Sequence, residues 1–257
     1  MGATSSMSTV EPNRPSDSLL PATFVLPLDG SDFSLRAVPF ASWWAQRFDA
    51  DVFAITTPQT IDDAERLRLP VWLDALSTRT RLTAAVIDED DPAHAIAQVV
   101  AARPNAAVCM ATHARGRVGS VALGDVCERV LRTVNTPVLL IGSHCADAPG
   151  EDGPVLVCHD GSAAADAVVA PALAWGSAAG LAIVVAHVYR PSETSAPKAG
   201  DAVHRRLDAF GRNRRVEVIS GSFPAGSIRD LAHELDASMI AMSTHGHTGA
   251  NALAMGR

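Results

Sequence analysis

The sequence predicts an α/β protein built from two doubly wound parallel-sheet domains. Short apolar runs rich in valine, isoleucine and alanine alternate with longer stretches of helical spacing, which is the pattern of buried strands joined by crossover helices. The pattern also repeats: Asp29-Gly30-Ser31 and Asp160-Gly161-Ser162 stand 131 residues apart, and Gly124 and Gly256 stand 132 apart. A period of this size is that of a whole domain, which indicates a duplication.

The first copy contains five apolar runs that predict strands, at residues 24–28, 52–56, 83–87, 106–111 and 138–141. Ser31 can cap a helix that runs to about Phe48. Further helices are expected over 61–79, from Asp91-Pro92 through Ala102, and over 125–133. Proline in the first turn supports the start at Asp91.

The second copy repeats this order, with strands expected at 155–158, 183–188, 216–219 and 239–242, and helices at 162–178, 200–210 and 226–235. Right-handed crossovers predict strand order 3-2-1-4-5 in each copy. Gly124 is followed by a helix and a strand, whereas Gly256 is followed only by Arg257. The second domain is therefore predicted to lack its last helix and strand.

The domain organisation follows from composition. Residues 1–20 are rich in serine, proline and threonine and are predicted to form a flexible tail. Domain 1 is expected over 21–143, a linker over 144–153, and an incomplete domain 2 over 154–257. Trp43, Trp44 and Trp175 fall on the first helices and are predicted to anchor a core or an interface.

Composition excludes several classes of function. The formal net charge of −7 over 257 residues argues against a nucleic-acid partner, which needs a basic face. There is no apolar leader and no run long enough to span a bilayer, so a cytoplasmic protein without a membrane partner is expected. The four cysteines form no C-x-x-C pair, so no zinc or redox site is predicted.

The repeated motifs fall where ligands bind in such sheets, beyond the carboxyl ends of the strands. Asp-Gly-Ser follows the first strand of each copy, and Thr-His follows the fourth. His245 and His247 could pair on a metal, but no carboxylate or cysteine cluster accompanies them. No Ser-His-Asp arrangement is legible either. We therefore predict neither a metal site nor a catalytic residue.

Over residues 22–257 the chain resembles the universal stress protein family in its tandem form, most clearly at 28–31, 106–139 and 237–256. ATP-binding members of that family carry Gly-x2-Gly-x9-Gly-Ser/Thr after strand four, where backbone amides approach phosphate. In copy two Ser243 replaces the first glycine, whereas Gly246 and Gly256 fit. In copy one Ala111 and Ala114 replace the first two glycines, and Asp125 replaces the Ser/Thr after Gly124.

The resemblance implies nucleotide-contacting residues in both copies. They are Asp160, Gly161, Val188, Ser243, His245, Gly246 and Gly256 in copy two, and Asp29, Gly30, Ala111 and Gly124 in copy one. ATP, with Mg²⁺ accompanying it, is the implied ligand. A plainer interpretation stays open: the glycines shape surface loops, the aspartates face helix N-termini, and Val188 is an ordinary core residue.

The function expected from the resemblance is that of a nucleotide-responsive stress regulator. It would bind ATP or a related adenine nucleotide, mainly in domain 2, and would not be a turnover enzyme. One alternative is a dimeric scaffold of the same fold that binds no nucleotide, and another is a slow adenine-nucleotide hydrolase. The resemblance also implies a homodimer that pairs through residues 137–142, because the strand at 138–141 would form an open sheet edge.

Overall fold

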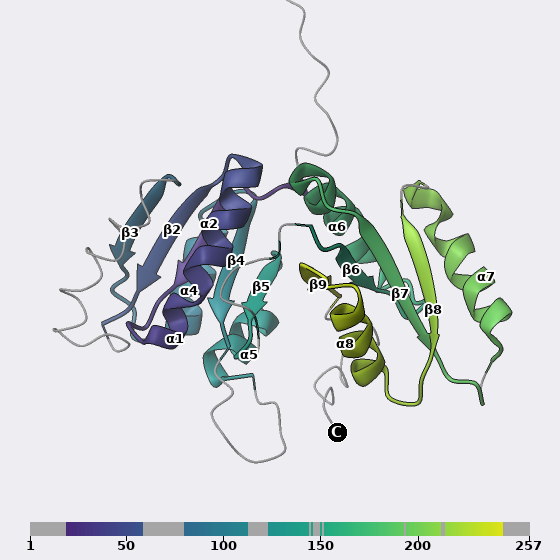
Figure 1. Cartoon of the computed structure of the whole chain (residues 1–257). Helices are drawn as coiled ribbons and strands as arrows, with labels where there is room; N and C mark the ends of the chain where they lie inside the picture. Colours follow the sequence, from purple (N-terminus) through teal and green to yellow (C-terminus); the bar gives the residue numbers. More distant parts are fainter. Residues whose placement is uncertain are drawn as a thin grey trace, which may run out of the picture.

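The computed structural model describes residues 19–58, 80–112, 123–143, 145, 150, 152–192, 194–211 and 214–243. In these ranges the chain forms two parallel sheets with helices on both faces (Figure 1). We call sheet A with its helices domain 1, and sheet B with its helices domain 2. No helix of the described residues is long and apolar enough to cross a membrane.

Sheet A confirms the predicted strand order, since its strands run β3-β2-β1-β4-β5 and every pair is parallel. The central strand β1 pairs with β2 from Thr23↔Asp51 to Pro27↔Ile55 and with β4 on its other side. The strands are β1 (Thr23–Pro27), β2 (Asp51–Thr56), β3 (Leu82–Val86), β4 (Ala106–Ala111) and β5 (Val138–Ile141).

Both faces of sheet A are buried. Phe24 and Leu26 point into the core beneath α2 (Ala37–Phe48), whereas Val25 points into a second core beneath α4 (Pro92–Ala101). All three side chains are fully buried. This two-sided burial explains why the strands are nearly continuous apolar runs and do not alternate with polar residues.

The helix starts of domain 1 follow capping residues. The Ser31 hydroxyl accepts a hydrogen bond from the Ser34 amide at 3.1 Å and caps α1 (Asp32–Leu35). The Asp91 carboxylate accepts from the amide of Ala93 at 3.0 Å and caps α4. The first contact confirms the predicted cap at Ser31, and the second confirms the predicted helix start at Asp91. α5 (Asp125–Thr133) lies where it was expected.

One predicted helix is divided in two. The stretch expected to run unbroken from Ser31 to Phe48 ends at Leu35 and restarts as α2 after Arg36. Pro39 accounts for the break, because it has no N–H to donate to the Leu35 carbonyl and its ring crowds that group. The predicted helix over 61–79 lies outside the described residues.

Sheet B repeats the topology with four strands in the described part, in the order β8-β7-β6-β9, again all parallel. This matches the predicted order 3-2-1-4, and the described residues include no fifth strand. The strands are β6 (Val155–Cys158), β7 (Ile183–Tyr189), β8 (Arg215–Ser220) and β9 (Met239–Ala241).

The helices of domain 2 shift against their predicted bounds. α7 (Ala196–Leu207) and α8 (Pro224–Glu234) begin before the expected residues 200 and 226, because proline is favoured in a first turn and starts these helices earlier. α6 (Asp166–Ala179) begins later than the expected residue 162. Residues 163–165 instead form tight i→i+3 turns, with Asp166 donating to Ala163.

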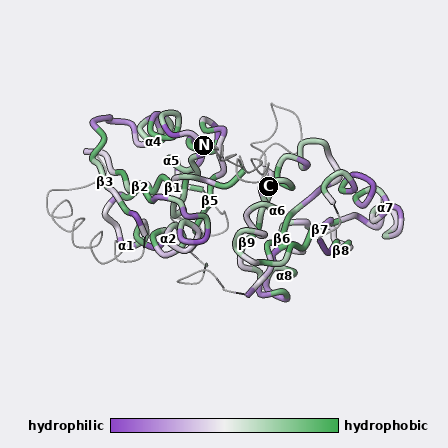
Figure 2. The backbone as a smooth tube through the Cα atoms, turned by 90° about the horizontal axis from the view of Figure 1, so that it is seen from above, coloured by the Kyte–Doolittle hydropathy of each residue, from purple (hydrophilic) through white to green (hydrophobic). Residues whose placement is uncertain are grey.

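Trp175 joins the two domains. It projects from α6 of domain 2, is 5% exposed, and lies 5.9 Å from Phe24, 5.3 Å from Trp44 and 5.2 Å from Phe48 of domain 1, measured between ring centroids. Its indole N–H donates to the Leu19 carbonyl at 3.2 Å. Figure 2 shows the domains side by side, with hydrophobic residues along the strands inside each. One continuous apolar core therefore spans both sheets.

Candidate nucleotide site

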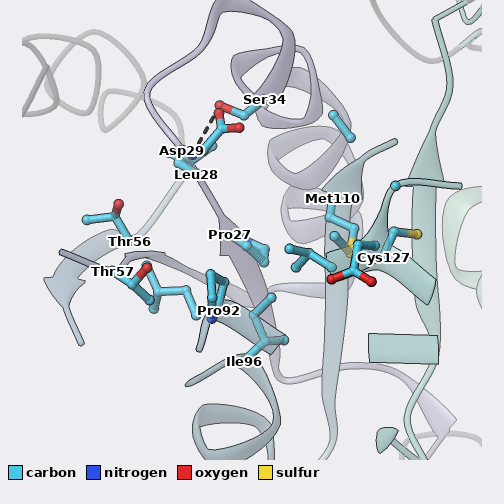
Figure 3. Close-up of a pocket in the computed structure, with 15 residues that line it drawn as sticks. Pro27, Leu28, Asp29, Ser34, Thr56, Thr57, Pro92, Ile96, Met110 and Cys127 are labelled. Carbon is cyan, nitrogen blue, oxygen red and sulfur yellow. Dashed lines mark hydrogen bonds between the residues drawn. The ribbon is translucent and has the colours of Figure 1, made fainter. Parts of the chain in front are cut away.

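A cavity of about 290 Å³ opens in domain 1 at the carboxyl ends of β1, β2 and β4 (Figure 3). This is the switch point of the sheet, where the strand order reverses and open α/β folds bind ligands. The residues around it are Pro27, Leu28, Asp29, Ser34, Ile55, Thr56, Thr57, Pro92, Ile96, Met110, Ala111, Gly124, Asp125, Val126 and Cys127.

The inner wall of the cavity is apolar. Leu28, Ile55, Ile96 and Met110 are all at most 6% exposed and come from β1, β2, α4 and β4 or the residues beside them. Such a wall suits a flat uncharged ring, since burial of apolar surface stabilises by about 25 cal/mol per Å².

The loop after β1 gives the cavity a polar side. The Asp29 carboxylate accepts hydrogen bonds from the amide of Ser31 at 3.0 Å and from its hydroxyl at 2.6 Å. The Asp29 amide donates to the Ser34 hydroxyl at 3.4 Å, and Figure 3 shows the two side by side. Gly30 has φ 79°, which favours glycine. The turn thus fixes Asp29 at the rim.

The opposite rim is the start of α5. Gly124 occupies the N-cap position, and Asp125 is the first helical residue. The Asp125 carboxylate lies 4.0 Å from the Arg129 guanidinium, which also pairs with Asp91. The hydrogen bond from Arg129 lowers the pKa of Asp91 below its ordinary value. This rim is therefore a network of carboxylates around one arginine.

Cys127 is the one thiol among the cavity residues, and it is a poor nucleophile. Burial, reinforced by the nearby Glu128 carboxylate, raises the pKa of Cys127 to about 11, so the protonated thiol is the form present at neutral pH. Burial likewise raises the pKa of Cys158 to about 12. Among the described residues no group of three or more His, Cys, Asp or Glu could hold a metal ion.

Domain 2 builds the same loop after β6. The Ser162 amide donates to the Asp160 carboxylate at 2.8 Å, and Gly161 has φ 87°. These features reproduce the turn at Asp29 and Gly30, so the duplication extends to backbone geometry.

A buried polar cluster sets domain 2 apart. His159 stands where domain 1 has the apolar Leu28, and its side chain is fully buried. Its Nδ1 accepts from the Gly161 amide at 3.0 Å, which places the ring proton on Nε2, 3.1 Å from Asp166. Arg206 binds Asp166 through two hydrogen bonds of 2.8 Å. In domain 2, polar contacts thus occupy the position that Leu28 fills in the apolar wall of the domain 1 cavity.

The Asp166–Arg206 pair leads to a stability prediction. Burial alone would raise the pKa of Asp166, but the hydrogen bonds from Arg206 and His159 outweigh it, so this pKa lies below its ordinary value of 3.8. Since the folded-state pKa is depressed, the pair stabilises the fold above about pH 4 and is lost as pH falls through the folded pKa. Arg206→Ala should lower the free energy of unfolding by about 2 kcal/mol at pH 7.

The measurement is urea denaturation of wild type and Arg206→Ala at pH 7 and at successively lower pH. The difference between the two should shrink below about pH 4, as the pH falls toward the depressed folded-state pKa of Asp166. Arg205→Ala, next along α7, is the control and should change little. A difference that stays constant with pH would show that the ion pair does not carry the effect.

The structure places the predicted site residues unevenly. Asp29, Ala111 and Gly124 line the domain 1 cavity, and Gly30 shapes the loop beside it. His245, Gly246 and Gly256 lie outside the described residues. In domain 2, Asp160 and Gly161 form the loop after β6, whereas Val188 pairs with Ile219 in β7 and β8 and Ser243 follows β9.

Sequence reasoning missed several cavity residues: Thr56, Thr57, Pro92, Ile96 and Cys127. Thr56 ends β2 and Thr57 follows it, and β2 is next to β1 in the predicted order. The predicted strand order could therefore have located the two threonines beside the site. No motif marks Ile96 or Cys127, because both are ordinary buried residues of helices.

Comparison with models of protein families identifies the family of this chain. The model described as "universal stress protein family" matches residues 22–142 and again 153–257. The chain belongs to the universal stress protein family. The double match also confirms the tandem arrangement predicted from the repeat. No curated protein sequence matches the chain significantly.

Solved structures agree on the fold. A universal stress protein from Archaeoglobus fulgidus is 19% identical, with 88% of this chain and 86% of that chain covered and a TM-score of 0.64. A functionally unknown protein from Pseudomonas aeruginosa is 14% identical, with 91% and 86% covered and a TM-score of 0.68. At these identities the likeness shows a shared two-domain fold and nothing about ligands.

Proposed function

We propose that this universal stress protein binds an adenine nucleotide or nucleoside and acts as a ligand-responsive regulator that does not turn its ligand over. The observation that carries the proposal is the cavity at the switch point of sheet A, with apolar residues inside and Asp29 at its rim. The apolar wall suits a purine ring, and the carboxylate can accept hydrogen bonds from ribose hydroxyls.

The domain that holds the ligand is a separate question. The glycine pattern of the sequence favours domain 2, and that prediction rests on Gly246 and Gly256, outside the described residues. The described geometry favours domain 1, because its cavity is bordered by Leu28 whereas domain 2 has buried His159 at the matching position. We propose domain 1 as the main site and keep domain 2 as the alternative.

Matched substitutions in the two domains distinguish these sites. Ala111 ends β4 and lines the cavity, and Ser243 occupies the corresponding position after β9. Ala111→Phe should fill the domain 1 cavity and weaken adenosine and AMP binding by more than about tenfold, or 1.4 kcal/mol. Isothermal titration calorimetry on the full chain measures adenosine and AMP binding to wild type, Ala111→Phe and the matched variant Ser243→Phe.

The two outcomes are opposed. Loss of binding in Ala111→Phe, with Ser243→Phe close to wild type, supports the domain 1 site. The reverse pattern would move the site to domain 2. If wild type binds neither adenosine nor AMP at millimolar concentration, the proposed function is wrong. Circular dichroism of each variant checks that a loss does not come from unfolding.

The sheet edges favour a second candidate, the dimeric scaffold. Within the described residues β5 pairs only with β4, and β9 only with β6, so each presents an open edge. Ile240 of β9 is 41% exposed. Pairing of residues 137–142 with a second copy of the chain remains our proposal for how a homodimer forms. Slow hydrolysis is the third alternative, and no contact of the described residues specifically favours it.

A further inference from the structure

We infer that the domain 1 cavity selects an uncharged adenine nucleoside over ATP. This inference rests on the proposed function and concerns the charge of the ligand at that site. The family resemblance implies ATP with Mg²⁺, and the residues around the cavity do not fit a triphosphate. Three observations support this: the size of the cavity, the carboxylates at its rim, and the engagement of the nearby arginines.

The cavity is small. Its volume of about 290 Å³ is at the low end of the ~300–1,000 Å³ typical of ligand sites. Its depth lies between the apolar side chains of Leu28, Ile55 and Met110, which suit a purine ring and offer a phosphate no hydrogen bond. A nucleoside matches a cavity with an apolar interior and a polar rim, with its base inside and its ribose at the rim.

The rim is acidic where a phosphate would have to lie. A helix N-terminus normally attracts anions through its free amides and dipole. At α5, however, the first turn holds Asp125 and Glu128, and Asp29 faces the cavity from the loop after β1. Asp125 and Glu128 compete for the positive end of α5, and all three carboxylates repel further negative charge. The feature that would bind a phosphate is thus already neutralised.

The two arginines of α5, and Arg36, two residues after the cavity residue Ser34, are engaged. Arg129 pairs with Asp91 and Asp125, and Arg132 pairs with Glu128. Arg36 donates to the backbone carbonyls of Ser143 and Cys145, at 3.0 Å and 2.6 Å. A polyphosphate would have to break such contacts to gain a counter-charge. A ribose needs no counter-charge, since its hydroxyls donate to carboxylates.

The test compares adenosine, AMP and ATP by isothermal titration calorimetry on the full chain at low ionic strength, with and without Mg²⁺. We expect affinity to fall in that order, with ATP at least about tenfold weaker than adenosine. Asp125→Asn removes one rim charge without changing its shape. It should raise the affinity for ATP relative to adenosine by about tenfold.

Asp49→Asn is the matched control, because it makes the same change in net charge away from the cavity. Asp49 ends α2 on an exposed side, pairs with Arg81, and has φ 53°, which asparagine tolerates. This variant should leave the ratio of ATP to adenosine affinity unchanged. An equal response of the two variants would mean that net charge, and not the rim, sets the preference, and would overturn the inference.

The outcomes separate the inference from the proposed function. If ATP binds wild type as tightly as adenosine or more tightly, the inference is wrong while the proposed function stands. If neither adenosine, AMP nor ATP binds, both fail. If wild type binds adenosine more tightly than ATP, and Asp125→Asn selectively raises the affinity for ATP, the result supports both the inference and the proposed function.

Discussion

Replacing Trp175 by alanine is expected to lower the free energy of unfolding by about 3–5 kcal/mol, the usual cost of removing a large buried aromatic side chain. Trp175 belongs to domain 2 but packs against three aromatic rings of domain 1. The variant also loses the hydrogen bond to the Leu19 carbonyl. The substitution should therefore weaken the contact between the two domains as well as the packing of α6.

Urea denaturation followed by circular dichroism measures the effect, and a double-mutant cycle with Trp44→Ala isolates the contact between the domains. We expect a coupling energy of about 1 kcal/mol, typical of an aromatic pair. Trp43→Ala is the control, because Trp43 lies on the same helix as Trp44 and packs on Arg47. A loss no larger for Trp175→Ala than for Trp43→Ala would contradict the shared core.

Gly153→Ala is expected to destabilise domain 2 by about 2–3 kcal/mol, in the range of overpacking. A Cβ at this position would lie 1.9 Å from the carbonyl oxygen of Asp236 and 2.9 Å from the amide of Ser238. Both are backbone atoms, so no rotamer change relieves the contact. The same segment is tied down by the Ser238 amide, which donates to the Pro154 carbonyl at 3.0 Å.

Because the strain pushes on the residues that lead into β9, hydrogen exchange should rise first at residues 238–241. The amides of sheet A should keep their protection. Gly150→Ala is the control, since its added Cβ would meet only the Ser238 hydroxyl, at 3.4 Å. If both variants show wild-type exchange and stability, the packing of Gly153 against residues 236–238 is not as described.

Much of the fold could be predicted from the sequence because a buried parallel strand is an uninterrupted apolar run. β4, β5 and β6 have the predicted bounds, and the other strands differ by about a residue at their ends. Helix ends were less predictable, because proline acts in two ways. Pro224 starts α8 early, whereas Pro39 interrupts the helix expected from Ser31. The hydrophobic period alone does not separate these cases.

The site was predictable only where a turn leaves a signature. Asp29 and Gly30 could be placed because Asp-Gly-Ser after a strand is a specific turn motif, and it recurs in copy two. The choice between domains could not be made in this way. The choice depends on the residue before the Asp-Gly-Ser turn, which is Leu28 in domain 1 and His159 in domain 2. His159 contacts Asp166, which binds Arg206, and only the packing of α6 and α7 brings these residues together.

The most direct measurement of the central claim is a crystal structure of the full chain grown with saturating adenosine. The account predicts a bound nucleoside in domain 1, with its base against Leu28, Ile55 and Met110 and its ribose at the Asp29 rim. A nucleoside found only beside Asp160 in domain 2, or no bound nucleoside in either domain, would contradict the account.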